Sequence, residues 1–258
     1  MKNKEYQRKL IDLGIILFAY LFFASIPFGL FIKGEYAEWL IPILQIMMQI
    51  LFLAFWIFFV PRSSLKVVKI RTNLKNYVVM IPAFLICGSN FLYAAFRPGD
   101  YQPHFSWIFA IQVVLTFITV ANEEYLFRLV LIGNLDPIKK PIWKIVVAAA
   151  IFGICHIGAF LNSFNPVDLI NVAYTFGLGL ILGLIYVYGG APCTCICLHL
   201  LFNIVNGLVF GYAFVVSDFT TYILVNTGLA LFFGIYLLII YLVRFRKCVV
   251  YNVRGDEI

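Results

Sequence analysis

The chain has 258 residues, of which 63% are hydrophobic and only 12% are charged, and its mean hydropathy is +0.98. A soluble domain of this length exposes far more charge, so these values exclude a water-soluble globular protein. Apolar runs recur along the whole chain, and polar loops of about fifteen residues at most are too short for a separate domain. The sequence therefore predicts one integral-membrane domain over residues 1–258.

The net charge is +7, and most of the basic residues that give rise to it are concentrated in a few segments of the chain. Fifteen of the nineteen Lys and Arg residues fall in the two terminal segments, in residues 62–75 and in residues 139–140. These basic segments alternate with loops that are poor in Lys and Arg, which is the pattern of a membrane protein whose cytoplasmic loops are positive. The charge therefore indicates a lipid bilayer as the environment, and it predicts no nucleic-acid partner.

Apolar windows of about 20 residues predict the number of membrane spans. There are eight such windows: 10–32, 39–60, 77–96, 107–132, 142–160, 168–188, 191–214 and 221–243. An even number of spans agrees with the charge pattern, so we expect an all-α polytopic bundle with both termini in the cytoplasm. The window 168–188 contains Gly177, Gly179 and Gly183, which predicts close approach of neighbouring helices.

The six cysteines indicate no disulfide framework, because none lies in a predicted outside loop. Cys193, Cys195 and Cys197 alternate along one span, a spacing that matches neither a C-x2-C zinc site nor a redox motif. Apolar packing is the simpler interpretation of these three residues, and their role stays open.

Two adjacent glutamates, Glu123 and Glu124, lie inside the fourth predicted span. An ionised carboxylate at the centre of a bilayer costs about 3 kcal/mol, so such a pair indicates a functional site. Arg128 follows Glu124 by four residues and lies on the same helical face, where the two can form an ion pair. Glu123 is rotated by about 100° from Glu124 and is therefore free to face a polar cavity.

Polar residues also occur in the fifth and seventh predicted spans: His156 in the fifth, and His199 and Asn203, one helical turn apart, in the seventh. A carboxylate and two imidazoles can polarise a water molecule and move its proton, and an asparagine amide can stabilise an oxyanion. The same residues, Glu123, His156 and His199, can instead be zinc ligands. Taken singly, each residue also fits a structural role in helix packing.

Three motifs resemble those of the CAAX protease and bacteriocin-processing (CPBP, or Abi) family. Residues 123–128 match its EExxxR motif, residues 152–156 its FxxxH motif, and residues 199–203 its HxxxN motif. The motifs occur in the family's order on separate predicted spans, within residues 107–214. The resemblance implies that this region is the catalytic core of an eight-helix intramembrane endopeptidase.

The resemblance also implies roles for the residues of the motifs. Glu123 and His156 would activate water, His199 and Asn203 would stabilise the oxyanion, and Glu124 and Arg128 would form a structural ion pair. Members of the family are described as glutamate-type or as metallo-type proteases. We therefore expect either no cofactor or one zinc ion, which Glu123, His156 and His199 would bind.

The expected substrate is a peptide or a small membrane protein that is cut near the cytoplasmic leaflet of a bacterial plasma membrane. Substrate identity and oligomeric state are not indicated by the sequence. One alternative is a non-catalytic bacteriocin-immunity or regulatory protein with the same fold. Another is a proton-coupled transporter that uses Glu123, although no internal repeat supports it.

Overall fold

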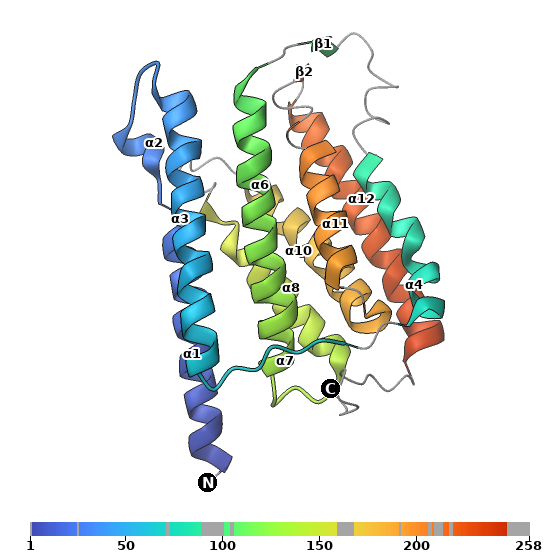
Figure 1. Ribbon diagram of the computed structural model, residues 1–258. Coiled ribbons are helices and arrows are strands. Elements are labelled where there is room, and N and C mark those ends of the chain that lie inside the picture. Colours follow the sequence, from blue (N-terminus) through green and yellow to red (C-terminus); the bar gives the residue numbers. More distant parts are fainter. Residues whose placement is uncertain are drawn as a thin grey trace.

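The computed structural model describes residues 2–24, 26–70, 73–88, 101–103, 106–158, 168–190, 192–205, 208, 214–216 and 219–246. These residues form a bundle that is almost entirely helical, as the sequence predicts (Figure 1). The exception is a pair of three-residue strands, β1 (Tyr101–Pro103) and β2 (Phe214–Val216), which lie antiparallel with Gln102 opposite Val215. The two strands pair the segment that precedes the predicted span 107–132 with the segment that precedes the predicted span 221–243.

Most of the described residues belong to helices. The α-helices are α1 (Lys2–Ala24), α2 (Phe28–Phe31), α3 (Ala37–Phe59), α4 (Leu74–Met80), α6 (Ile108–Glu124), α7 (Ile132–Asn134), α8 (Pro141–Cys155), α10 (Asp168–Leu184), α11 (Pro192–Phe202) and α12 (Phe219–Ile240). Val60–Arg62 and Ile81–Gly88 are 3-10 helical, and Tyr125–Leu131, Ile185–Gly189 and Tyr241–Phe245 are π-helical.

Each predicted span overlaps a helix, but the boundaries differ. Helix α1 begins at Lys2 and ends at Ala24, whereas the first span was predicted over 10–32. The helix therefore ends shortly before Pro27, which is the N-cap of α2. Proline disfavours helical geometry in the residue that precedes it and has no N–H of its own, which explains this end. Pro82 similarly lies where α4 passes into a 3-10 helix. Parts of the predicted spans 77–96, 142–160 and 191–214 lie outside the described residues.

Four helices of the described residues are long and apolar enough to cross a membrane. They are Ala37–Arg62, Ile108–Asn134, Leu169–Gly189 and Thr227–Phe245. Pro141–Cys155 and Pro192–Val205 are apolar but shorter. The chain is therefore a multi-pass membrane protein.

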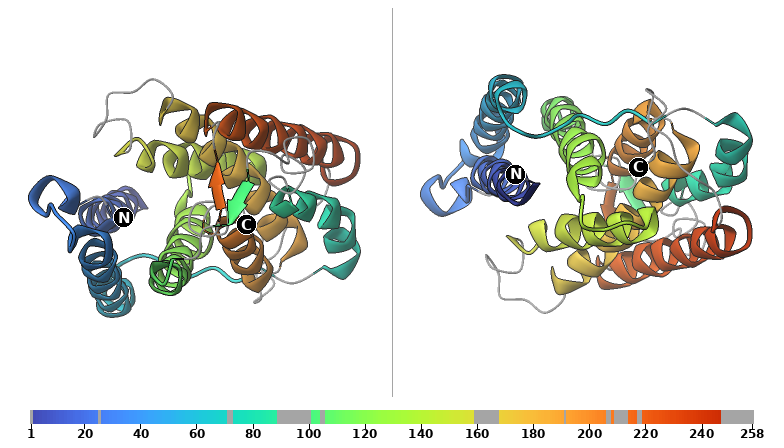
Figure 2. Two further views of the ribbon diagram at one scale, coloured as in Figure 1. Left: turned by 90° about the horizontal axis from the view of Figure 1, so that it is seen from above. Right: turned by 90° about the horizontal axis from the view of Figure 1, so that it is seen from below.

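Helix α6 lies between two groups of helices. On one side α3 packs against α6, and α1 packs against α3; on the other side α11 packs against α6. Helix α10 packs against both α8 and α12 (Figure 2). The central position of α6 matters because this helix carries Glu123 and Glu124 at its end.

Glycines allow α8 and α10 to approach closely, as the sequence predicts. A Cβ atom added at Gly153 would lie 2.9 Å from the backbone oxygen of Val172, and one at Gly179 would lie 3.1 Å from Ala149. A Cβ at Gly183 would lie 2.7 Å from Ile145. Small residues at such crossings let helix backbones meet in an apolar environment. This contact fixes the end of α8, and therefore the position of His156, which directly follows it.

Residues 63–70 form a strap that runs across one end of the bundle (Figure 1). Ser64 donates to Asp12 on α1 from its backbone N–H (2.7 Å) and its hydroxyl (2.6 Å). Farther along, the side chain of Asn134 accepts from the Lys66 N–H (3.0 Å) and donates to its carbonyl (2.8 Å). A Cβ atom at Gly133 would overlap the side chain of Val68 in the strap. Glycine at this position therefore leaves the space that Val68 occupies. These bonds join helices that are distant in the sequence.

We expect Gly153→Ala to destabilise the bundle by about 1–3 kcal/mol, because the new methyl group meets a backbone oxygen that cannot move without separating two helices. Gly234→Ala is the matched control, since a Cβ there has nothing within 4 Å and alanine favours the helix. Thermal unfolding in detergent should show a lower midpoint for the first variant only. Equal midpoints would contradict the tight α8–α10 contact.

Candidate active site

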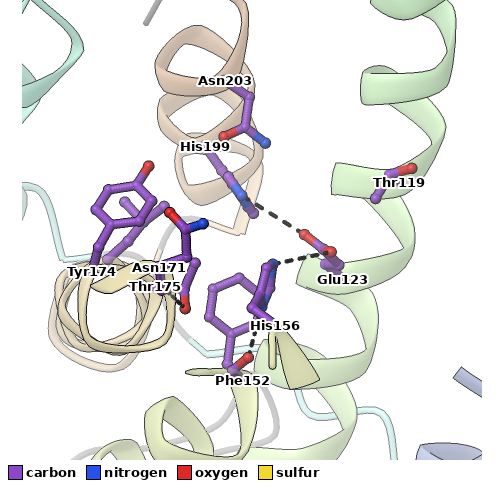
Figure 3. A pocket seen from close by; sticks show the side chains of 10 residues that line it. Thr119, Glu123, Phe152, His156, Asn171, Tyr174, Thr175, His199 and Asn203 are labelled. Atoms are coloured by element: carbon purple, nitrogen blue, oxygen red, sulfur yellow. Dashed lines mark hydrogen bonds and ion pairs between the residues drawn. The ribbon is translucent and has the colours of Figure 1, made fainter. Parts of the chain in front are cut away.

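A cavity of about 330 Å³ lies among α6, α8, α10 and α11. Its walls include all four residues that the sequence predicts as catalytic: Glu123, His156, His199 and Asn203. Figure 3 shows Glu123 on one side, the two imidazoles pointing toward it from two other elements, and Asn203 one turn from His199. The opposite wall belongs to α10, which contributes Asn171, Tyr174, Thr175 and Leu178.

Three consecutive buried residues of α6 point to three different partners. Asn122 donates from its amide to the side-chain oxygen of Gln49 on α3 (2.8 Å) and accepts from the indole of Trp56 (3.0 Å). Glu123 faces the cavity, and Glu124 accepts from His199 on α11. Because successive residues of a helix are about 100° apart, one short sequence can connect three neighbours.

Glu124 lies between a cation and an imidazole. Its Oε1 accepts from His199 Nδ1 at 2.9 Å, and its Oε2 lies 3.1 Å from Arg128 Nε. The contact with Arg128 is an ion pair without hydrogen-bond geometry, since neither of these two atoms has a hydrogen-bond partner among the described residues. Glu124 and Arg128 are each only 1% exposed. The carboxylate therefore does more than neutralise Arg128, because it also orients His199.

Arg128 belongs to the π-helical segment Tyr125–Leu131, which directly follows α6. Its guanidinium carbon lies 5.1 Å from the centre of the Phe152 ring, within the range of a cation–π interaction. The same ring meets the imidazoles of His156 (centroids 4.7 Å apart) and His199 (5.9 Å apart) edge to face. Phe152 therefore packs against three of the polar residues that the motifs contain.

The hydrogen bond of His156 determines which ring nitrogen faces Glu123. Nδ1 lies 2.8 Å from the backbone oxygen of Phe152. A carbonyl only accepts, so Nδ1 carries the proton, and Nε2 of the neutral ring has a free lone pair. Nε2 lies 4.0 Å from Glu123 Oε1, and His199 Nε2 lies 3.7 Å from Glu123 Oε2. Both distances exceed a direct hydrogen bond, and they suit a water molecule that touches both partners.

The same residues are the candidates for a metal site. Glu123, His156 and His199 do meet at one cavity. Among the described residues, however, no three His, Cys, Asp or Glu side chains form a group that could hold a metal ion. The described cysteines do not converge either, since Cys195 is buried, whereas Cys193 and Cys197 are exposed.

Several residues of the site were not predicted from the sequence. Tyr20 donates from its hydroxyl to Glu123 Oε1 at 2.7 Å, and Asn122 joins α6 to α3. Asn171 and Thr175 line the cavity from α10. An asparagine next to the two glutamates in a predicted span is a signal that could have been used. Tyr20, one of 15 tyrosines, has no such signal.

We expect Arg128→Ala to destabilise the protein by about 3–5 kcal/mol, because it removes one partner of a fully buried ion pair and leaves Glu124 with His199 as its remaining partner among the described residues. Its effect on activity should be nearly as large as that of Glu123→Ala. The exposed Arg62, which donates to a backbone oxygen of its own helix, provides the control Arg62→Ala, with a change of about 1 kcal/mol or less. Thermal unfolding and peptide cleavage would measure both. A fully active and stable Arg128→Ala variant would refute the role of this pair.

Comparison with known proteins supports the assignment of this region. No curated protein and no solved structure matches the chain. The model of one family, described as type II CAAX prenyl endopeptidase Rce1-like, matches residues 104–205. This segment holds all three motifs and the four residues that converge on the cavity. The resemblance to CAAX proteases is therefore confirmed, and over residues 104–205 the chain is similar to the Rce1-like type II CAAX prenyl endopeptidases.

Proposed function

We propose that the protein is an intramembrane endopeptidase that hydrolyses a peptide bond in a membrane-associated peptide or protein. The observation that carries this proposal is the convergence of Glu123, His156, His199 and Asn203 on one cavity. These residues come from three separate segments of the chain, and together they supply a base and oxyanion donors, which amide hydrolysis requires. The similarity to CAAX prenyl endopeptidases agrees with this reaction.

The nucleophile in this proposal is a water molecule between Glu123 and His156. Glu123 takes a proton while the water oxygen attacks the scissile carbonyl, and the lone pair of His156 Nε2 accepts the second hydrogen bond of the water. When the tetrahedral intermediate collapses, the C–N bond breaks and the proton passes from Glu123 to the leaving amine. The 4.0 Å between Glu123 Oε1 and His156 Nε2 supports this arrangement.

His199 and Asn203 are the proposed oxyanion donors. His199 already uses Nδ1–H on Glu124, so donation from Nε2 requires the doubly protonated imidazolium. With that charge, the buried set of Glu123, Glu124, Arg128 and His199 is neutral overall, which favours its burial. Asn203, one turn farther along, adds an uncharged amide donor to the same cavity.

We propose that this reaction requires no metal ion, and no step above uses one. Support comes from the spacing of Glu123 and His156, since 4.0 Å between Oε1 and Nε2 leaves room for a water molecule that contacts both side chains. A zinc ion, if it were bound by Glu123, His156 and His199, would supply a metal-activated water instead. Sensitivity to chelators distinguishes the two types of protease.

We further propose that the whole chain is one integral-membrane domain with eight spans and both termini in the cytoplasm. Contacts at one end of the bundle support the orientation. Lys9 near the N-terminus forms an ion pair with Asp136 (2.6 Å), and Asp12 bonds to Ser64. The basic N-terminus and the two basic loops, around residues 62–75 and 139–140, therefore lie together, as expected for cytoplasmic loops.

The proposed substrate is a prenylated CaaX peptide or another small membrane-bound peptide, cut at the cytoplasmic leaflet of a bacterial plasma membrane. Besides the predicted catalytic set, the cavity has three polar or aromatic side chains of α10, Asn171, Tyr174 and Thr175, which can contact a bound peptide. A bacteriocin-processing role is the variant of this proposal in which the peptide is a bacteriocin precursor. Cleavage assays with a farnesylated CaaX peptide and with its unmodified form distinguish these substrates.

Glu123→Gln should reduce kcat for such a peptide by about 10²–10⁴-fold, because the amide cannot accept the proton of water. Glu38→Gln changes an exposed glutamate of α3 in the same way and should retain full activity. Purified protein in detergent, with cleavage followed by mass spectrometry, is the assay. The wild type should be unaffected by 1,10-phenanthroline. Cleavage by Glu123→Gln at the wild-type rate would refute Glu123 as the base, absence of cleavage by the wild type would argue for a non-enzymatic protein, and inhibition by the chelator would argue for a metalloprotease.

Asn203→Leu should lower kcat by about 10²–10³-fold with little change in KM, because the amide acts on the oxyanion, which forms only in the transition state. Steady-state kinetics on the same peptide would test this. A rise in KM at unchanged kcat would show instead that Asn203 binds the substrate.

A further inference from the structure

Tyr20 brings helix α1 into contact with the proposed catalytic base. It lies far outside the segment that matches the CAAX endopeptidase family, and it is 3% exposed. Its hydroxyl donates to Glu123 Oε1 at 2.7 Å, across 103 residues of sequence. A hydroxyl that bonds to a carboxylate forms a charge-assisted hydrogen bond, which is among the stronger kinds in proteins.

The ring of Tyr20 is held from two sides. It meets Phe52 of α3 at 5.6 Å and Phe127 of the π-helical segment at 5.5 Å, both edge to face. Helix α1 itself is tied to the rest of the bundle through Lys9 and Asp12. A tyrosine has few rotatable bonds, so this packing fixes the position of its hydroxyl.

The hydrogen bond fixes the orientation of the Glu123 carboxylate. Oε1 is held by Tyr20 and lies 4.0 Å from His156 Nε2, which leaves Oε2 to face His199 at 3.7 Å. Without the bond, the carboxylate can rotate about its last torsion and turn both oxygens away from the imidazoles. Small displacements of reacting groups lower rates strongly, by about 10²-fold for 1 Å.

Tyr20 acts through Glu123 rather than on the substrate. The described side chains that line the cavity include Glu123 but not Tyr20, which lies behind the carboxylate. We propose that Tyr20 is a positioning residue of the active site, and that α1 thereby completes a site whose motifs all lie on other helices. This inference rests on the proposed function of Glu123 as the base.

Tyr20→Phe tests the proposal because it removes the hydroxyl and keeps the ring between Phe52 and Phe127. We expect kcat to fall by about 10–100-fold with KM within about twofold. The matched control is Tyr186→Phe, which removes the hydroxyl of another buried tyrosine, one that donates to the backbone of Val68. Both variants lose one buried hydrogen bond, so both should unfold at slightly lower temperature, but only Tyr20→Phe should lose kcat.

A second variant separates positioning from folding. Replacing Tyr20 by 4-aminophenylalanine keeps a donor at the same place on the ring and should restore kcat to within about fivefold of wild type. Equal kcat for Tyr20→Phe and Tyr186→Phe, or no rescue by the amino variant, would overturn the role of Tyr20. An inactive Glu123→Gln alongside these results leaves Glu123 standing as the base, whereas an active Glu123→Gln removes the proposed role of Glu123 itself.

Discussion

Two adjacent carboxylates in an apolar bundle must each have polar partners of their own, because an unpaired buried charge destabilises the fold severely. Glu124 meets this requirement with Arg128 and His199, and Glu123 meets it with Tyr20 and the cavity. The contacts continue from Arg128 to the ring of Phe152, which also touches both imidazoles. The groups that compensate for the buried charges of the two carboxylates are thus largely the same groups that orient the side chains around the cavity.

The sequence predicts which residues meet at the cavity better than it predicts the limits of the helices. Buried charges in an apolar run have few structural explanations, so Glu123 and Glu124 indicate a site directly, and helical spacing pairs Glu124 with Arg128. Hydropathy locates each helix but leaves its ends open: it extends the first span beyond Pro27, although α1 ends at Ala24. It also gives no sign that α6 continues as a π-helix, since that geometry depends on contacts with other segments.

The residues that the sequence did not reveal share a physical cause. Tyr20, Gln49 and Trp56 lie on α1 and α3, and none of them belongs to a motif or a spacing pattern that the sequence shows. Their importance comes from partners 66 to 103 residues away, Asn122 and Glu123. Only the packing of α1 and α3 beside α6 gives them a role, and a pattern within one helix contains no information about that packing.

The contacts of the consecutive residues Asn122, Glu123 and Glu124 explain why the orientation of Glu123 depends on α1 and α3, which contain none of the three motifs. One residue binds α3, the next receives a hydrogen bond from α1, and the third binds α11. Because these residues are consecutive, a shift of α3 that rotates Asn122 also rotates Glu123 with respect to the imidazoles. The segment that resembles the CAAX endopeptidases contains the residues of the proposed active site, and α1 and α3 fix the rotation of the helix that carries Glu123. The orientation of Glu123 is therefore a property of the whole bundle rather than of its motifs.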